Sequence, residues 1–449
     1  MSMFRQVTIP QRSGQKGVRA EGTVPVTQFL GIFPNRSMTV IVMMECYRRY
    51  TIRCTSFYSI ISHEPPVFNR FFSCLWKISE MRALLERTDT QMKTFNVGII
   101  GATGMVGQRF ATLLADHPWF HVTALAASPR SAGKTYKEAV EGRWAMQAPL
   151  PEKLADMVML DASKVDEVAS KVDFVFCAVD MKKDEIRALE EAYAKAECPV
   201  VSNNSAHRGT PDVPMIIPEL NPEHAEIIPA QRKRLGTKRG FVAVKSNCSL
   251  QSYVPALFPL SKFGLKEALV CTYQAISGAG KTFERWPEMV DNVIPYIGGE
   301  EEKSEQEPLK IWGHIEGDKI VNATTPAFTA QCLRVPVSDG HFAAVFCRFE
   351  NKPTKEEILD AWKSFRGRPQ ELELPSAPKQ FLHYFEEDNM PQTKLHRGLE
   401  GGMAISLGRL REDSQYDYKF VGLSHNTLRG AAGGAVLLAE LLCAEGYMD

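Results

Sequence analysis

The stretch Phe95-Asn-Val-Gly-Ile-Ile-Gly-Ala-Thr-Gly-Met-Val-Gly107 decides the fold of this chain. An apolar strand over 95–100 runs into a glycine-rich turn, and apolar residues at helical spacing predict a helix over 106–115. Such a turn lets backbone N–H groups and the helix N-terminus face a pyrophosphate, whose approach larger side chains would block. The alternative is a glycine turn that only tightens strand-to-helix packing. The predicted dinucleotide-binding residues of this loop are Gly101, Thr103, Gly104, Met105, Val106 and Gly107.

The residues after the second predicted strand, over 122–127, indicate which dinucleotide binds. An acidic residue at this place would accept hydrogen bonds from the ribose 2′-OH of NAD. The chain instead reads Ala-Ser-Pro-Arg-Ser-Ala-Gly-Lys over 127–134. Hydroxyls and two cations suit a 2′-phosphate, which arginine can bind through two hydrogen bonds. We therefore expect NADP(H) rather than NAD, held by Ser128, Arg130, Ser131 and Lys134.

The remaining pattern predicts two differently built domains. Strands over 172–179 and 199–202 alternate with a helix over 182–197, which is typical of a doubly wound α/β fold. Beyond residue 248 the sequence predicts mainly strands, with one helix over 355–365 and another over 428–442. The expected fold class is α/β, a Rossmann-type NADP-binding domain plus an α+β catalytic and dimerisation domain with a mixed sheet. We expect the NADP-binding domain over 92–247, the catalytic domain over 248–424, and a C-terminal helix over 425–449 that packs back on the first domain. The expected strands of the second domain are 268–276, 319–323, 342–349 and 404–411.

Composition excludes several functional classes. Lys+Arg 53 balance Asp+Glu 53 and the pI is about 7.1, which gives no reason to expect nucleic acid or a membrane as partner. Ten cysteines without any Cys-x-x-Cys spacing argue against a zinc site and favour reduced thiols in a cytosol-like compartment. We therefore expect a cytoplasmic enzyme without a metal.

Residues 1–91 form a basic extension that we expect to be poorly ordered and outside the chemistry. Residues 1–93 hold 13 Lys/Arg and 6 Asp/Glu, and they show no sustained helical or strand period. Such an acid-poor leader is typical of an organelle transit peptide. The alternative is an over-long gene start, because Met92 leads directly into the first strand. Both interpretations stay open.

A candidate nucleophile lies in Ser-Asn-Cys-Ser-Leu-Gln over 246–251. A helix-like run over 253–260 follows Cys248, and a helix N-terminus would lower the pKa of its thiol. The alternative is an inert buried cysteine. His341, seven residues after Arg334, is the histidine best placed to serve as general acid or base near a cleft.

Several motifs in order resemble the aspartate-semialdehyde dehydrogenases of archaea and fungi, over residues 92–449. The matching stretches are Gly-Ala-Thr-Gly-Met-Val-Gly (101–107), Ser-Asn-Cys-Ser (246–249), Tyr-Gln-Ala-Ile-Ser-Gly (273–278), Glu-Glu-Glu-Lys (300–303), the Arg334 and His341 pair, and Asn-Thr-Leu-Arg-Gly-Ala-Ala-Gly (426–433). The resemblance implies reduction of L-aspartyl-4-phosphate by NADPH, on the route to lysine, threonine and methionine. It also implies a homodimer or homotetramer that pairs through the sheet of the second domain.

Residue roles follow from the resemblance. Cys248 would form a thioester with the substrate, and His341 would be the general acid/base. Gln274 would orient the intermediate. The assignment of Glu300 and Lys303 could shift by one or two positions, because several acidic residues follow one another here. The alternative interpretation of residues 300–307 is a solvated helical face. The implied substrate residues are Arg334 for the carboxylate, Glu300 for the ammonium group, and Lys303 and Arg208 for the phosphate; Ser277, Gly278 and Asn426 would contact the coenzyme.

Three other functions are considered. N-acetyl-γ-glutamyl-phosphate reductase uses the same thioester chemistry on an acylated amine. Malonyl-CoA reductase could share nearly every motif. An inactive dinucleotide sensor should have lost Cys248 or His341, and both are present.

Overall fold

The computed structural model describes residues 28–35, 38–47, 51–54 and 94–449. The chain divides into two compact units, Met1–Gln91 and Met92–Asp449. In the first unit, β1 (Gln28–Asn35), β2 (Met38–Tyr47) and β3 (Thr51–Cys54) form an antiparallel sheet in the order β1-β2-β3. This sheet was not predicted, because residues 1–93 show no sustained strand period. The other residues of the extension, which we expected to be poorly ordered, lie outside the described part of the chain.

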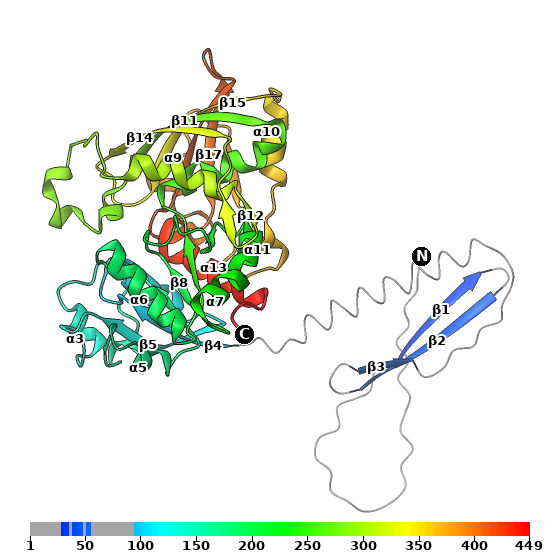
Figure 1. Cartoon of the computed structure of the whole chain (residues 1–449). Helices are drawn as coiled ribbons and strands as arrows, with labels where there is room; N and C mark the ends of the chain where they lie inside the picture. The colour runs from blue at the N-terminus through cyan, green and yellow to red at the C-terminus, as the bar shows by residue number, and fades with distance from the viewer. Residues whose placement is uncertain (1–27, 36–37, 48–50, 55–93) are drawn as a thin grey trace, which may run out of the picture. The chain divides into compact units, whose positions relative to one another are not determined.

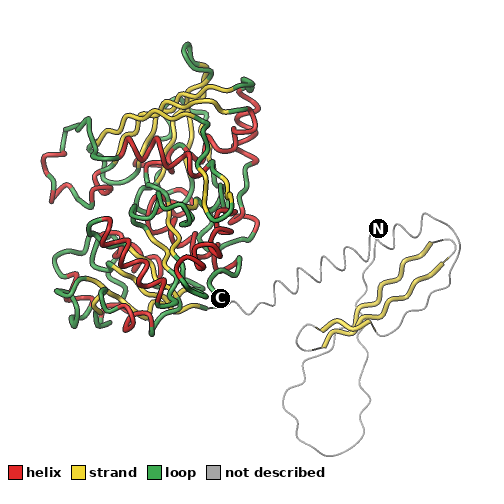
Figure 2. Tube along the Cα trace, viewed as in Figure 1, coloured by secondary structure: helices red, strands yellow, loops and turns green. Residues whose placement is uncertain are grey.

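A parallel sheet forms the centre of the first half of the larger unit, as Figures 1 and 2 show. Its order is β6-β5-β4-β7-β8-β10-β9. The chain adds β5 and β6 on one side of β4 and then crosses over to add β7 on the other side. The direction of strand order therefore reverses beside β4, and sheets of this kind bind ligands at such a switch point. The strands are β4 (Phe95–Ile100), β5 (Phe120–Ala127), β6 (Leu160–Asp161), β7 (Phe174–Cys177), β8 (Val200–Ser202), β9 (Met215–Ile216) and β10 (Val242–Lys245).

Helices cover both faces of this sheet. Helix α2 (Met105–Leu114) lies on one face together with α13 (Gly433–Ala444). The opposite face packs against α6 (Lys183–Lys195). Burial on two faces explains why β4 and β7 are apolar almost throughout. Shorter helices connect the strands: α3 (Tyr136–Val140), α4 (Glu152–Ala155), α5 (Val165–Ala169) and α7 (Ile228–Leu235).

The second half is built on a mixed sheet of order β14-β11-β15-β18-β17-β16 (Figure 2). Side chains alternate along these strands. Val270 and Val345 belong to the face that packs on the core, whereas Tyr273 on the other face is 36% exposed. Helix α9 (Glu300–Ile311) contacts β14, and α10 (Lys355–Ser364) contacts β16. A separate two-stranded sheet pairs β12 (His314–Glu316) with β13 (Lys319–Val321). The strands of the mixed sheet are β11 (Leu265–Gln274), β14 (Ala327–Arg334), β15 (His341–Phe349), β16 (Leu382–Phe385), β17 (Ile405–Glu412) and β18 (Tyr418–Ser424).

The expected fold class is confirmed, but two predicted helices differ. The run over 253–260 is only a short helix, α8 (Val254–Leu257), between 3-10 segments, because Pro259 lacks the N–H group that would continue it. The predicted helix over 428–442 begins with a π-helical segment, η8 (Leu428–Ala432), before α13. None of the helices in the described part is long and apolar enough to cross a membrane.

A buried ion pair ties η8 to the rest of the fold. Arg429 donates from Nη1 to Glu219 Oε1 at 2.7 Å and also bonds Oε2, and the two side chains are 1% and 0% exposed. The guanidinium further donates to Gln251 Oε1 at 2.9 Å and lies 4.6 Å from the ring centroid of Phe381. One side chain of η8 thus contacts three other parts of the chain.

Replacing Arg429 by Met should lower the free energy of unfolding by about 3–5 kcal/mol, because the Glu219 carboxylate would remain buried without its partner. Urea denaturation measures this change. In the matched control, Lys153→Met removes an ion pair to Asp116 whose side chains are 73% and 85% exposed, and the midpoint should stay within error. Equal losses from both variants would contradict the assignment.

Candidate active site

Cys248 lies where the two sheets meet. It follows β10 by three residues, and its Sγ is 3.4 Å from Nε2 of His341, the first residue of β15. The backbone of Gly430 closes over the cysteine, since a Cβ on that glycine would lie 2.8 Å from the Cβ of Cys248. Residues 93 positions apart in sequence therefore form a thiol–imidazole pair in a buried junction.

His341 is held as a neutral imidazole. Its Nδ1 accepts a hydrogen bond from the backbone N–H of Ala275 at 3.0 Å, and its side chain is fully buried. Burial, followed by the nearby charge of Arg334, lowers the pKa of His341 to about 3. The ring is therefore uncharged at neutral pH.

The expected lowering of the Cys248 pKa is wrong for this structure. The segment behind it is a 3-10 turn of four residues (Ser249–Ser252), too short to supply a strong helix dipole. Burial is the main cause that raises the pKa of Cys248, and Glu300 acts in the same direction. The cations Lys245, Arg208 and Arg334 act in the opposite direction.

Glu300, at the start of α9, accepts hydrogen bonds from three side chains near the thiol. Its carboxylate accepts hydrogen bonds from Asn247 Nδ2 at 3.0 Å, Gln274 Nε2 at 3.1 Å and Lys303 Nζ at 2.7 Å. Burial opposes its charge, but Lys303 and these hydrogen bonds outweigh burial and lower the pKa of Glu300. Because Glu300 is only 8% exposed, a solvated helical face is the wrong interpretation for this position.

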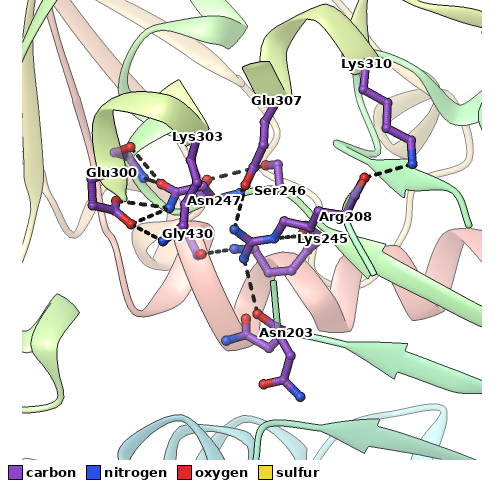
Figure 3. Close-up of polar contacts among 12 residues, drawn as sticks. Asn203, Arg208, Lys245, Ser246, Asn247, Glu300, Lys303, Glu307, Lys310 and Gly430 are labelled. Carbon is purple, nitrogen blue, oxygen red and sulfur yellow. Dashed lines mark hydrogen bonds and ion pairs between the residues drawn. The ribbon is translucent and has the colours of Figure 1, made fainter. Parts of the chain in front are cut away.

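Arg208 reaches the same region but is already paired within the protein (Figure 3). It donates to Glu307 Oε1 at 2.9 Å, to the carbonyl of Lys245 at 3.0 Å and to that of Asn203 at 3.3 Å. Glu307 also accepts the backbone N–H of Asn247 at 2.7 Å. A phosphate here would share Arg208 with a carboxylate. The sequence interpretation did not single out Glu307, although its place seven residues after Glu300 puts both on one helix face.

Arg334 and His341 converge on Gly278. A Cβ at Gly278 would lie 3.1 Å from Arg334 Nη1 and 3.1 Å from His341 Cε1. Arg334 is 6% exposed and donates to the carbonyl of Ala275 at 2.7 Å. The six predicted residues that the structure brings together around the thiol are Cys248, His341, Gln274, Arg334, Glu300 and Lys303.

The predicted coenzyme loop has the close approaches that require glycine. Gly101 has φ of +89°, and a Cβ there would lie 2.4 Å from the carbonyl oxygen of Ala178. A Cβ at Gly107 would lie 2.2 Å from the carbonyl oxygen of Gly101. The loop also has Thr103 and Gly104 accessible, just before α2 begins at Met105. The N–H groups of Gly101, Ala102 and Gly104 bond protein carbonyls, so it is the N-terminus of α2 that can face a pyrophosphate.

The remaining predicted coenzyme residues fall into two groups. Ser128, Arg130 and Lys134 are exposed after β5, and Ser131 is buried among them. Asn426 instead joins two active-site loops, accepting from the N–H of Gly340 at 2.8 Å and donating to Ser277 Oγ at 2.9 Å. A cavity of about 680 Å³ extends from this place, with lining residues that include Met105, Arg109, Ser277, Asp339, Arg397 and His425. These groups suit the two ends of a long dinucleotide.

The fold and the matching family models define a nicotinamide-dependent semialdehyde dehydrogenase. The semialdehyde dehydrogenase NAD binding domain matches residues 96–228, and the semialdehyde dehydrogenase dimerisation domain matches residues 257–429. The chain belongs to the aspartate-semialdehyde dehydrogenase family.

Three relatives illustrate the match. Aspartate-semialdehyde dehydrogenase of Aspergillus fumigatus is 42% identical over 360 residues, covering 78% of this chain and 98% of that protein. The Saccharomyces cerevisiae enzyme of the same name is 43% identical over 361 residues, covering 77% and 97%. A crystal structure of the Candida albicans enzyme with NADP superposes with a TM-score of 0.72 at 38% identity, covering 79% of this chain and all of that one.

The buried neutral histidines predict an acid-sensitive fold. Burial lowers the pKa of His341 to about 3 and that of His425 to about 4, whereas an unfolded histidine titrates near ~6.5. Below pH ~6.5 the unfolded state therefore binds more protons, and stability falls by up to about 1.4 kcal/mol per pH unit for each histidine. Urea midpoints from pH 7 to 4 should fall less steeply for His341→Asn than for the wild type. Parallel curves would contradict the neutral assignment.

Proposed function

We propose that this chain reduces L-aspartyl-4-phosphate with NADPH, giving L-aspartate 4-semialdehyde, phosphate and NADP⁺. This reaction belongs to the biosynthesis of lysine, threonine and methionine. The observation that carries the proposal is the 3.4 Å contact between Cys248 Sγ and His341 Nε2 beside a glycine-rich dinucleotide loop. The names of the fungal relatives and the NADP in the Candida albicans structure support the substrate and the coenzyme.

In the proposed mechanism, the Cys248 sulfur attacks the acyl carbon of the substrate. A C–S bond forms and the S–H and C–O bonds break, so that the thiol hydrogen leaves with the phosphate and a thioester remains on the enzyme. When bound, NADPH supplies the hydride that reduces this thioester. His341 donates its Nε2 hydrogen toward the developing oxyanion, and Gln274 orients the acyl group. Breaking the C–S bond then releases the aldehyde and restores Cys248.

Charged groups around the thiol give the proposed substrate its orientation. Arg334 would bind the α-carboxylate through two hydrogen bonds. Glu300 would attract the substrate ammonium group. Lys303 and Arg208 would bind the phosphate, with Arg208 shared with Glu307. Asn426, which already holds Ser277 and Gly340, would lie against the nicotinamide end of the coenzyme, with Gly278 beside it.

The buried carboxylate of Glu300 should decide between substrates. It suits a free ammonium group, which N-acetyl-γ-glutamyl phosphate and malonyl-CoA both lack. NADPH oxidation should therefore be fastest with aspartyl phosphate, and Glu300→Gln should raise KM for this substrate. Cys248→Ser should lose essentially all turnover, because a hydroxyl in this setting is a weak nucleophile.

The control for this assay is Glu301→Gln, which changes the next carboxylate on α9. Its side chain meets Gln331 and the N–H of Cys332 on β14 instead of the thiol cluster. Turnover of malonyl-CoA or acetylglutamyl phosphate, with none of aspartyl phosphate, would overturn the substrate assignment.

We further propose that two copies pair through the second sheet as a homodimer, alone or within a tetramer. The matched dimerisation domain supports a homo-oligomer. The face of the sheet that points away from the core is largely apolar, and Tyr273 and Phe342 pack there with ring centroids 6.3 Å apart. Burying this face against a second copy would remove apolar surface from water.

Phe342→Asp should weaken this association, because pairing would bury an unpaired carboxylate in the interface. Light scattering at micromolar concentration should give at least twice the 50.2 kDa chain mass for the wild type and a smaller mass for the variant. Val158→Asp, at a 57% exposed position outside the second sheet, is the control and should not change the mass. A monomeric wild type would contradict the proposal.

For localisation we propose a reducing compartment, the cytoplasm in the simplest case. The seven cysteines among residues 94–449 are free. Import into an organelle through residues 1–91 is the alternative, and N-terminal sequencing of the native protein distinguishes the two.

A further inference from the structure

Glu307 is a buried carboxylate that has no role of its own in the proposed reaction. It lies on α9 about two turns after Glu300, and it is only 9% exposed. Both of its oxygens accept hydrogen bonds (Figure 3): Oε1 from Nη1 of Arg208 at 2.9 Å, and Oε2 from the backbone N–H of Asn247 at 2.7 Å. One side chain thus contacts both the arginine proposed to bind phosphate and the residue before Cys248.

Arg208 is held in one orientation and still has donors for a ligand. Its Nε donates to the carbonyl of Lys245 at 3.0 Å and its Nη2 to that of Asn203 at 3.3 Å, besides the bond from Nη1 to Glu307. A guanidinium has five N–H groups, so among the described residues these three bonds leave one N–H on each terminal nitrogen for an anion. The two carbonyls already fix the plane of the guanidinium. The distinct contribution of Glu307 is therefore its negative charge.

The surroundings of the thiol are rich in positive charge. Arg208 and Arg334 both act on the thiol as cations. The nearby carboxylate of Glu300 is already paired with Lys303 at 2.7 Å. Such a site attracts a phosphate group before and after its bond to the acyl carbon breaks. Tight binding of substrate and product alike lowers KM without raising kcat, and a tightly held product leaves slowly.

Glu307 offsets this attraction at Arg208. Their side chains are each 9% exposed and form an ion pair at 2.9 Å, so water and salt screen the interaction little. A phosphate that binds Arg208 therefore meets an arginine whose charge and one N–H group are already engaged by a carboxylate. This competition weakens the bond between Arg208 and phosphate, and it favours release of the phosphate that thioester formation produces.

We propose that Glu307 is a positioning residue that lowers the affinity of Arg208 for phosphate, so that the phosphate displaced from the acyl group leaves the site. Glu307 acts on substrate and product through Arg208, and it makes or breaks no covalent bond. The inference rests on the proposed function, in which Arg208 binds the substrate phosphate.

The test is the binding of inorganic phosphate to the coenzyme-free enzyme, measured by isothermal titration calorimetry. Glu307→Gln removes the charge at nearly constant volume, and its amide oxygen can still accept the N–H of Asn247. Phosphate should bind this variant at least about fivefold more tightly than the wild type, because Arg208 is no longer shared with a carboxylate. The KM for aspartyl phosphate and the inhibition constant of phosphate should fall as well, without a rise in kcat. A merely structural loss would weaken phosphate binding instead.

Glu305→Gln is the matched control on the same helix. The Glu305 carboxylate accepts the N–H of Ala330 on β14 at 3.1 Å, and its loss should leave phosphate binding unchanged. Arg208→Met should weaken phosphate binding, and adding Glu307→Gln to it should then have a much smaller effect than in the wild type. Circular dichroism shows whether each variant is folded. Glu307→Asn, which removes the same charge, replaces Glu307→Gln if the latter is unfolded.

Unchanged or weaker phosphate binding by the folded Glu307 variant would overturn the inference. So would full phosphate affinity in Arg208→Met, or an equal gain from Glu307→Gln in that background, because Glu307 would then not act through Arg208. Phosphate binding needs no turnover, so these outcomes are independent of the proposed reaction, which fails instead if the enzyme does not reduce aspartyl phosphate.

Discussion

The close approach of the Gly430 backbone to Cys248 is the constraint on which the active site depends. Only a glycine fits, because any side chain there would meet the cysteine Cβ at 2.8 Å. The same short segment carries Arg429, whose buried pair with Glu219 anchors it, and it follows Asn426, which holds the loops of Ser277 and Gly340. One π-helical turn near the end of the chain therefore fixes Cys248, the loop before His341 and the cavity beside Ser277 together.

Burial sets the electrostatics of this junction. It raises the pKa of Cys248 and lowers that of His341, so both side chains are uncharged at neutral pH. The surrounding cations offset this cost, since opposite charges ~4 Å apart attract by about 4 kcal/mol at an effective dielectric constant of ~20. The site is thus arranged so that negative charge, on sulfur or on an incoming phosphate, is stabilised while water is excluded. A neutral imidazole that donates a hydrogen bond fits this arrangement better than a charged one.

The sequence predicts the architecture well because its signals are local. The glycine loop after an apolar strand indicates the coenzyme-binding turn, and β4 has the bounds predicted for it. Signals fail where long-range packing decides, because burial reverses the predicted direction of the Cys248 pKa shift. The helix expected behind Cys248 failed for a local reason, since Pro259 cannot continue α8. The buried contact of Lys245 with Gly430 was not predicted, although a lysine that ends the apolar run Val-Ala-Val is unusual in a buried strand. Its partner carbonyl lies 185 residues away, beyond any local pattern.

The central claim is that the substrate becomes covalently bound to the sulfur of Cys248. Its most direct measurement is the intact mass of the enzyme after mixing with aspartyl phosphate in the absence of coenzyme. We predict a gain equal to one aspartyl group, located on the peptide that contains Cys248, with one phosphate released for each adduct. Release of phosphate from a protein of unchanged mass would contradict the account.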